Sequence, residues 1–391
     1  MELDIGSEYA PFRAEVAAFL AEKWPNLEES DPVRAAAGFR RHAIERGYFY
    51  RSVPRRYGGS GQVSDPLRAQ IIREEFARAR APRELEGPGV SMLVPTLLAR
   101  GEEWQREKFI APTLSGEIAW CQGYSEPSAG SDLASLRTRA VLDGDEWVVN
   151  GQKVWTSLAH KADYMFALVR TEPDAPKHQG LTYMIIPMKQ PGITVRPLRQ
   201  MTGGADFNEV FLDDARTPKD WIVGARGDGW SVSRTTLKHE RNMVGGAGAT
   251  AKLFDKLIEL ARIATREGRP VLEFDDVRQE LARIQGYVEA QRYAALRQGS
   301  MELAGQDPGL IGLLNKLNGT QIRARIVALA QELIGGAGLA ESRPREHEPQ
   351  EQWVYHIIRT LGIALAGGAS NIQRNVIAER GLGLPRERAG L

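Results

Sequence analysis

The sequence predicts an α+β protein of three domains: an N-terminal helical domain, a middle β-barrel-like domain and a C-terminal helical bundle. Three observations support this. Apolar residues recur at helical spacing as far as residue 116, short β-branched runs fill 117–225, and longer helical patterns occupy 226–391. A chain of 391 residues is long enough for several hydrophobic cores. We therefore expect domains at 1–116, 117–225 and 226–391.

The first region shows helical spacing with clear start signals. Val16, Phe19 and Leu20 fall on one apolar helix face. An Asp-Pro pair opens a second helical pattern over 65–78, because Asp caps a helix and Pro suits its first turn. The glycines in 57–61 separate such helices.

The middle region reads as strands joined by tight turns. Asp143-Gly144 and Asn150-Gly151 both predict hairpin turns, since a positive φ costs little at Asn, Asp and Gly. Further short runs rich in β-branched and aromatic residues are 164–171, 181–187 and 192–198. Together they indicate a small all-β domain of roughly 100 residues.

The last region predicts a helical bundle. One apolar face comprises Val277, Leu281, Ile284 and Val288, and a second comprises Ile322, Ile326, Leu329 and Leu333. Gly335-Gly336 predicts the end of the second helix. The run 246–251 matches a dinucleotide fingerprint, but we expect it inside a long helix, where small residues allow close packing.

Composition excludes several classes of function. The formal net charge of +1 gives no basic footprint for nucleic-acid binding, and no apolar run reaches the ~18 residues of a membrane span. Six scattered histidines and a single cysteine, Cys121, predict no metal site. The opening residues lack the basic and apolar regions of a secretory signal, so we expect a cytoplasmic protein.

Two segments carry the chemistry. Residues 120–132 combine small hydroxyls, glycines and backbone amides, which can donate hydrogen bonds to an extended polar ligand. Residues 150–157 set Trp155 beside Thr156 and Ser157, which suits covering a flat ring and bonding its edge. A barrel turn and a core tryptophan explain either segment alone equally well, but the two together are more specific.

These segments resemble the acyl-CoA dehydrogenase family. Ser125-Glu126-Pro127 with Ala129-Gly130-Ser131-Asp132 resembles the family's flavin-loop signature. Further matches follow in the family's order along nearly the whole chain, at 179–187, 207–214, 372–375 and 378–385. The resemblance implies FAD bound without a Rossmann fold, as a two-electron acceptor.

By resemblance, the residues around the flavin ring are Gln122, Tyr124, Ser125, Trp155, Thr156 and Ser157. Gln122, Tyr124 and Ser125 would line the ring through backbone and hydroxyl contacts, and Trp155 would pack beside it. Thr156 and Ser157 would bond near the reactive N5 edge, where fixed donors stabilise the charge of the reduced ring. Ser131 falls where the family meets the pantetheine or phosphate part of coenzyme A.

The remaining flavin positions depart from the family pattern. Arg269 is a loose match to an arginine that reaches a neighbouring subunit's FAD, and Gly335-Gly336 follows Glu332 where a glutamine is usual. Ala369 replaces a common threonine, and Asn371 stands at an adenine-side position. Since the family shares its flavin sites across subunits, we expect a homotetramer or homodimer, with a mixture with a paralogue left open.

The catalytic base also departs from the common pattern. The usual carboxylate position is Gly367 here, whose backbone N–H can still bond the thioester oxygen. A group that includes isovaleryl-CoA dehydrogenase places a glutamate before an arginine on the first long C-terminal helix, where this chain has Glu240 and Arg241. We expect Glu240 to be the base and Arg241 to contact coenzyme A; a surface ion pair of Glu240 is the alternative.

The expected reaction is FAD-dependent dehydrogenation of an acyl-CoA to the trans-2-enoyl-CoA, with electrons passed to an electron-transfer flavoprotein. A flavin monooxygenase or nitro-compound oxidase on the same fold and a non-catalytic partner subunit are the alternatives. The sequence does not define the acyl group: Gly245, Gly246 and Gly248 fit either a roomy pocket or close helix packing.

Overall fold

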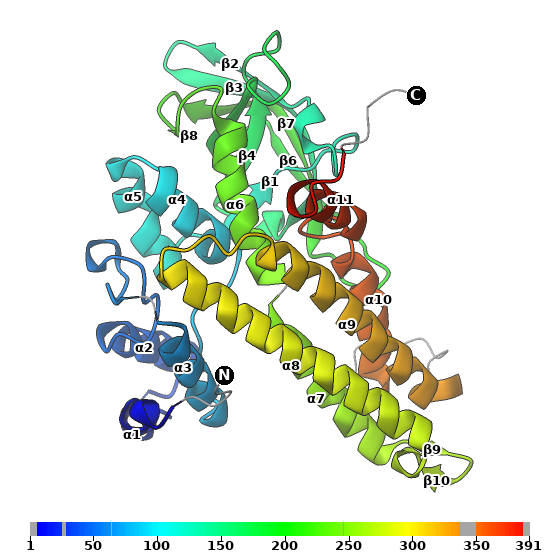
Figure 1. Cartoon of the computed structure of the whole chain (residues 1–391). Helices are drawn as coiled ribbons and strands as arrows, with labels where there is room; N and C mark the ends of the chain where they lie inside the picture. The colour runs from blue at the N-terminus through cyan, green and yellow to red at the C-terminus, as the bar shows by residue number, and fades with distance from the viewer. Residues whose placement is uncertain (1–5, 26–28, 64, 245, 337–348, 386–391) are drawn as a thin grey trace. The chain divides into compact units, whose positions relative to one another are not determined.

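The computed structural model describes residues 6–25, 29–63, 65–244, 246–336 and 349–385. N-terminal helices, a middle β-sheet and C-terminal helices follow one another along the chain, which confirms the predicted fold class (Figure 1). The chain forms two compact units. The first comprises Met1–Ser128, Ala134–Val195 and Glu209–Thr236, and the second comprises Ala129–Leu133, Arg196–Asn208 and Leu237–Leu391. The domain boundaries after residues 116 and 225 stay predictions.

The N-terminal helices bury the faces that the sequence marks. They are α1 (Ala10–Lys23), α2 (Pro32–Glu45), α3 (Pro66–Arg78), α4 (Val94–Arg100) and α5 (Glu103–Ser115). Val16, Phe19 and Leu20 on α1 are buried, as predicted. Asp65 caps α3 by accepting the backbone N–H groups of Leu67 and Arg68, both at 3.0 Å, so the Asp-Pro start signal is confirmed.

The middle region is a mixed eight-stranded sheet. Its strands are β1 (Trp120–Gly123), β2 (Arg139–Asp143), β3 (Glu146–Ser157), β4 (Tyr164–Arg170), β5 (Leu181–Pro187), β6 (Ile193–Leu198), β7 (Phe207–Pro218) and β8 (Ile222–Val223). The order is β6-β7-β3-β2-β4-β5-β8, and β1 pairs with β4 in parallel. Buried side chains of β4 and β5, such as Met165 and Ile186, form its core with Trp147 and Val149 of β3.

One of the two predicted hairpin turns is wrong. Asp143-Gly144 does turn the chain from β2 to β3, with Gly144 at φ +62°. Asn150-Gly151 instead lies within the continuous strand β3, where Asn150 pairs with Arg139. A Cβ at Gly151 would lie 2.7 Å from the Cα of Thr138, so this glycine permits a close approach of two chain segments rather than a turn.

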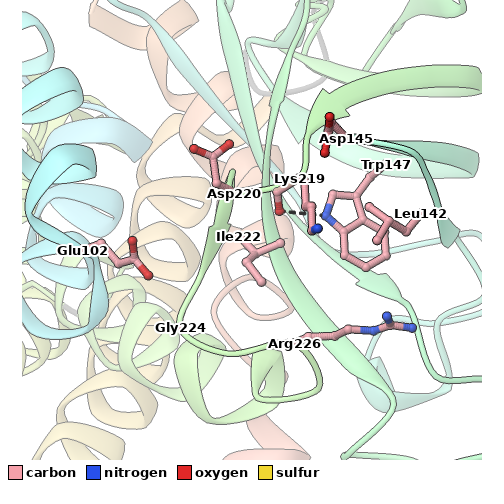
Figure 2. Close-up of a pocket in the computed structure, with 9 residues that line it drawn as sticks. All are labelled: Glu102, Leu142, Asp145, Trp147, Lys219, Asp220, Ile222, Gly224 and Arg226. Carbon is pink, nitrogen blue, oxygen red and sulfur yellow. Dashed lines mark hydrogen bonds between the residues drawn. The ribbon is translucent and has the colours of Figure 1, made fainter.

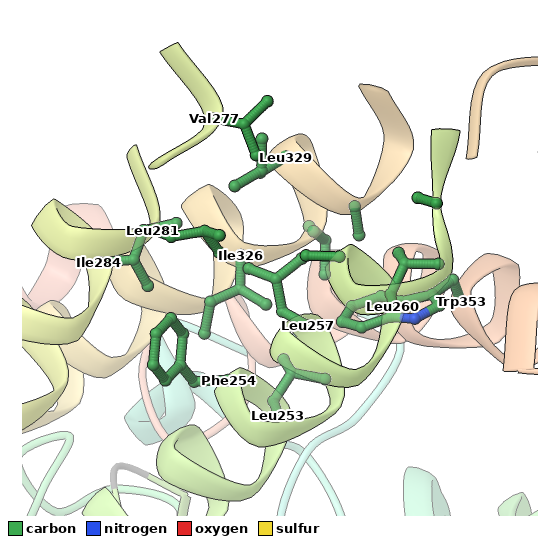
Figure 3. Close-up of a cluster of buried hydrophobic side chains, with 14 of the residues drawn as sticks. Leu253, Phe254, Leu257, Leu260, Val277, Leu281, Ile284, Ile326, Leu329 and Trp353 are labelled. Atoms are coloured by element: carbon green, nitrogen blue, oxygen red, sulfur yellow. The ribbon is translucent and has the colours of Figure 1, made fainter. Parts of the chain in front are cut away.

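The C-terminal region is helical, and its packing confirms the predicted faces. Its elements are α6 (Gly229–Val244), α7 (Ala247–Ile263), β9 (Thr265–Arg266), β10 (Arg269–Pro270), α8 (Asp275–Leu303), α9 (Ile311–Ile334), α10 (Pro349–Ile363) and α11 (Ser370–Gly381). Helices α7, α8 and α9 pack side by side (Figure 1). Figure 3 shows Phe254, Ile284 and Ile326 pointing into their shared core. Gly335 ends α9, as predicted.

The fingerprint-like run does not lie inside one long helix. Helix α6 ends at Val244, and Gly246 is the N-cap of α7, so that part of the prediction is wrong; Gly245 lies outside the described residues. A Cβ at Gly248 would meet no atom within 4 Å, which argues against close helix packing there. Among the residues that the structure describes, no helix is long and apolar enough to cross a membrane, and no His/Cys/Asp/Glu cluster could hold a metal ion.

Candidate functional site

The two predicted flavin segments lie against each other in the sheet. The backbone N–H of Val154 on β3 donates to the carbonyl of Ser125 at 2.9 Å, just beyond the end of β1. This bond joins the loop that follows Gln122 to the strand that carries Trp155. The structure therefore brings together residues that are about thirty positions apart in the sequence.

Trp155 is exposed rather than buried. Its side chain is 61% accessible, whereas Thr156 is fully buried and Ser157 is half-buried. Its backbone adopts φ +61°, a left-handed conformation that is uncommon for a bulky residue and is concentrated at functional sites. The alternative of a core tryptophan is therefore wrong for Trp155, while Trp147 on the same strand does occupy the core.

The loop residues differ in what they can offer a ligand. Gln122 and Ser125 are half-buried, so their polar side chains are accessible in part. Tyr124 is 4% exposed, and its ring packs edge-on against Phe166 and Tyr183. The main chain of Tyr124 is thus the part that faces away from the core.

Sequence reasoning missed a buried ion pair beneath these segments. Lys153 on β3 and Glu126 after β1 are 0% and 6% exposed, and Nζ of the lysine lies 2.9 Å from Oε1 of the glutamate. Burial opposes ionisation of Glu126, but Lys153 and backbone N–H donors hold its pKa below the ordinary value. One signal was present: Lys153 falls on the strand face that buries Trp147 and Val149.

The resulting surface suits a flat, uncharged ring. It offers the exposed indole of Trp155, the half-buried hydroxyls of Ser125 and Ser157, and the amide of Gln122. The one lysine in these two segments is buried and paired with Glu126. This donor set fits the isoalloxazine of FAD, which needs stacking and neutral hydrogen-bond donors.

The other predicted flavin and coenzyme A residues lie in the second unit. Ser131 is exposed. Arg269 on β10 hydrogen-bonds the carboxylate of Glu273 at 3.0 Å and lies 4.9 Å from the ring centroid of Phe274. Gly335 and Gly336 follow α9 and are exposed. Asn371, at the start of α11, is exposed and accepts a 3.0 Å hydrogen bond from Arg374.

Glu240 and Gly367 belong to two different elements of the second unit. Glu240 is half-buried on α6, and the side chain of Arg241 lies outside the described residues. Gly367 lies in the turn between α10 and α11 at φ +62°, a conformation that favours glycine. The buried Gln373 donates to the carbonyl oxygens of Gly367 and Gly368 at 3.1 and 3.3 Å, which holds this turn in place.

A separate pocket of about 570 Å³ lies in the first unit (Figure 2). Leu142, Trp147 and Ile222 contribute apolar surface, and the indole N–H of Trp147 donates to the carbonyl of Lys219 at 3.1 Å. The predicted flavin residues are not among its described lining residues. The pocket therefore does not coincide with the segments around Trp155.

Comparison with known proteins accounts for the whole chain. Family models for the N-terminal, middle and C-terminal domains of acyl-CoA dehydrogenase match residues 7–117, 121–215 and 227–382. The chain is 42% identical over 342 residues to acyl-CoA dehydrogenase IpdE1 of Mycobacterium tuberculosis (strain ATCC 25618 / H37Rv). That match covers 86% of this chain and 85% of the relative.

Solved structures agree. The Tcur3481-Tcur3483 steroid ACAD is similar with a TM-score of 0.80 and 29% identity, covering 99% of this chain and 100% of that one. The ChsE4-ChsE5 complex from Mycobacterium tuberculosis is similar with a TM-score of 0.79 and 28% identity, again covering 99% and 100%. The chain therefore belongs to the acyl-CoA dehydrogenase family, whose members are FAD-dependent oxidoreductases.

Proposed function

We propose that this chain dehydrogenates an acyl-CoA thioester at Cα–Cβ to the trans-2-enoyl-CoA and passes the electrons to an electron-transfer flavoprotein. The observation that carries this proposal is the half-buried Glu240 on α6, because α-proton removal requires a positioned carboxylate. Its neighbour Lys238 forms an ion pair with Glu302 of α8 at 3.3 Å, and this pair engages the cation nearest along the chain.

FAD would be held by the residues that the sequence and the surface around Trp155 single out. Gln122, Ser125, Trp155, Thr156 and Ser157 contact the ring, together with the main chain of Tyr124. By the family pattern, Arg269, Gly335, Gly336 and Asn371 serve the nucleotide part of the FAD of a neighbouring subunit. When bound, FAD supplies the acceptor for the hydride that leaves Cβ.

The chain's own residues carry the proton and orient the thioester. A carboxylate oxygen of Glu240 takes the proton from Cα. The backbone N–H of Gly367 donates to the thioester carbonyl oxygen and stabilises the charge that develops on it. Ser131 and Arg241 contact coenzyme A, which holds Cα within reach of the base.

The substrate class that we propose is a bulky, ring-bearing acyl group. Two observations support it. One of the similar structures, at 29% identity over nearly the whole chain, is a steroid ACAD. In addition, a Cβ at Gly248 would meet nothing within 4 Å, so the first turn of α7 has open space beside it. A panel of straight-chain, branched and ring-bearing thioesters tests this, since only the preferred class gives a high kcat/KM.

A mixed assembly is the second candidate, as a partner subunit that completes another chain's flavin site. The two similar structures are each named for two different chains. Glu332 and Ala369 also replace the polar residues that the family uses around FAD. Coexpression with a paralogue, followed by counting flavins per chain, distinguishes this arrangement from a homotetramer or homodimer.

The reaction is tested by its product. Purified enzyme, alone or coexpressed with its partner chain, is incubated with a thioester and an electron-transfer flavoprotein without oxygen. The proposal expects a product lighter by two hydrogens and one equivalent of reduced acceptor. Steady oxygen consumption with an oxygenated product would instead favour the monooxygenase alternative.

A further inference from the structure

The ammonium group of Lys153 is fully engaged beneath the two flavin segments. Its Nζ donates to the carbonyl oxygens of Leu168 and Tyr124 at 2.8 and 3.2 Å and to Oε1 of Glu126 at 2.9 Å. An ammonium group has three hydrogens, so these three acceptors saturate it. Lys153 therefore links strand β4 and the loop after β1 to strand β3.

Glu126 is equally engaged. Oε1 accepts the backbone N–H of Thr138 at 2.9 Å in addition to Lys153, and Oε2 accepts the backbone N–H of Arg137 at 2.6 Å. These bonds anchor the loop after β1 to the chain that enters β2. Charge-assisted hydrogen bonds of this kind are stronger than neutral ones.

The pair lies directly under the candidate ring-binding surface. Tyr124, whose carbonyl Lys153 holds, is bonded to Ser125 in the chain, and the carbonyl of Ser125 accepts from Val154 at 2.9 Å. Trp155 follows Lys153 by two residues on the same strand. Any shift of the ammonium thus moves the loop relative to the indole.

We propose that Lys153 and Glu126 are positioning residues for the flavin site, which hold the loop at Gln122–Ser125 and the strand at Trp155–Ser157 in the geometry that binds the ring. This inference rests on the proposed function, and it assigns the pair a role beyond fold stability. Because the two side chains are 0% and 6% exposed, water does not replace a lost partner, and the loop loses its anchor.

The test compares FAD binding with fold stability in the same variants. Lys153→Met keeps the length of the side chain but removes all three donors. Glu126→Asp keeps the charge but shortens the reach by one methylene group. We expect the FAD dissociation constant to rise about 10- to 100-fold in Lys153→Met and by less in Glu126→Asp. The rise in melting temperature that FAD gives the apoprotein shrinks in the same order.

Glu75→Gln is the matched control. Glu75 is 3% exposed and pairs with Arg13 at 2.6 Å among the N-terminal helices, so its loss also breaks a buried ion pair. We expect this variant to melt at a lower temperature and yet bind FAD as the parent does. The absorption band of the bound flavin shifts in the Lys153 and Glu126 variants but not in this control.

The outcomes separate the two claims. If Lys153→Met does not fold, Glu126→Asp decides, because it retains the ion pair. Parental FAD dissociation constants and flavin spectra in the folded Lys153 or Glu126 variants, with lowered melting temperatures alone, would overturn the positioning role. A parent chain that takes up no FAD, alone or with a coexpressed partner chain, would overturn the proposed function together with it.

Discussion

Nζ of Lys238 on α6 lies 3.3 Å from Oε1 of Glu302 on α8, two positions before Glu240 in the chain. The pair ties the helix that carries the proposed base to the long helix of the bundle. It also engages the lysine that a surface ion pair of Glu240 would most readily use. This supports the interpretation of Glu240 as a base and leads to the first prediction.

Replacing Glu240 by glutamine removes the proton acceptor and leaves the shape of the side chain nearly unchanged. We expect FAD content and thioester binding to stay at the parental level, while the rate of flavin reduction falls about 100-fold or more. Stopped-flow absorbance after anaerobic mixing with thioester measures that rate. Glu259→Gln, an exposed glutamate on α7, should reduce its flavin at the parental rate. Equal rates in the two variants would rule out Glu240 as the base.

Trp155→Ala tests the ring-binding surface. Since this side chain is 61% exposed, its loss should leave the melting temperature of the apoprotein unchanged. We expect FAD to bind about tenfold more weakly, because a stacking surface is gone. Val141→Ala, at a 60% exposed position of the same sheet, should bind FAD normally. Fluorescence titration of the apoproteins with FAD gives both constants, and matching constants would count against the assignment.

Gly151→Ala tests the close approach within the sheet. A Cβ there would lie 2.4 Å from Oγ1 and 2.7 Å from Cα of Thr138, so the backbone has to shift. We expect a loss of about 1–3 kcal/mol in the free energy of unfolding, as for other overpacked sites. Gly286→Ala, in the middle of α8 with open space around it, should gain up to about 1 kcal/mol. Urea unfolding measures both, and a neutral Gly151→Ala would contradict the structure here.

His356 on α10 predicts an acid-sensitive contribution to stability. Burial, together with the positive charges of Lys256 on α7, Arg359 on α10 and Arg323 on α9, lowers its pKa from 6.5 to about 4. Its Nε2 lies 3.2 Å from Nζ of Lys256. Between pH 6.5 and 4 the unfolded chain binds a proton at this histidine that the folded chain does not, so stability falls as the pH falls through this window.

His356→Gln removes that titration and keeps an acceptor for Lys256. We expect the variant to lose less free energy of unfolding than the parent when the pH is lowered from 7 to 4.5. Comparing the two slopes, rather than the absolute values, cancels the packing lost beside Trp353. Identical slopes in parent and variant would show that His356 does not titrate as its surroundings require.

The helices were predictable because their signals are local. The Asp65 cap, the buried face of α1 and the glycine that ends α9 depend on residues three or four positions apart. The Asn150-Gly151 turn failed because that dipeptide signal ignores tertiary context. Here Gly151 serves contact with Thr138, thirteen residues away in the sequence. The break at Gly246 was missed because a glycine is tolerated in helices as well as between them.

The candidate site divides in the same way. Trp155, Thr156 and Ser157 could be found because they stand together in one motif. The Lys153–Glu126 pair could not, since it joins residues 27 positions apart that only the pairing of β1 with β4 and of β2 with β3 brings together. A lysine on a strand face that is otherwise apolar was the one local hint.

The central claim is that bound acyl-CoA reduces the flavin of this protein, and anaerobic mixing of the FAD-loaded protein with ring-bearing, branched and straight-chain thioesters tests it most directly. We predict rapid loss of the oxidised flavin band with at least one thioester, fastest for the ring-bearing class, and recovery of the band on adding an electron-transfer flavoprotein. A flavin that stays oxidised with every thioester, in the chain alone and in its coexpressed assembly, would contradict the proposed dehydrogenation.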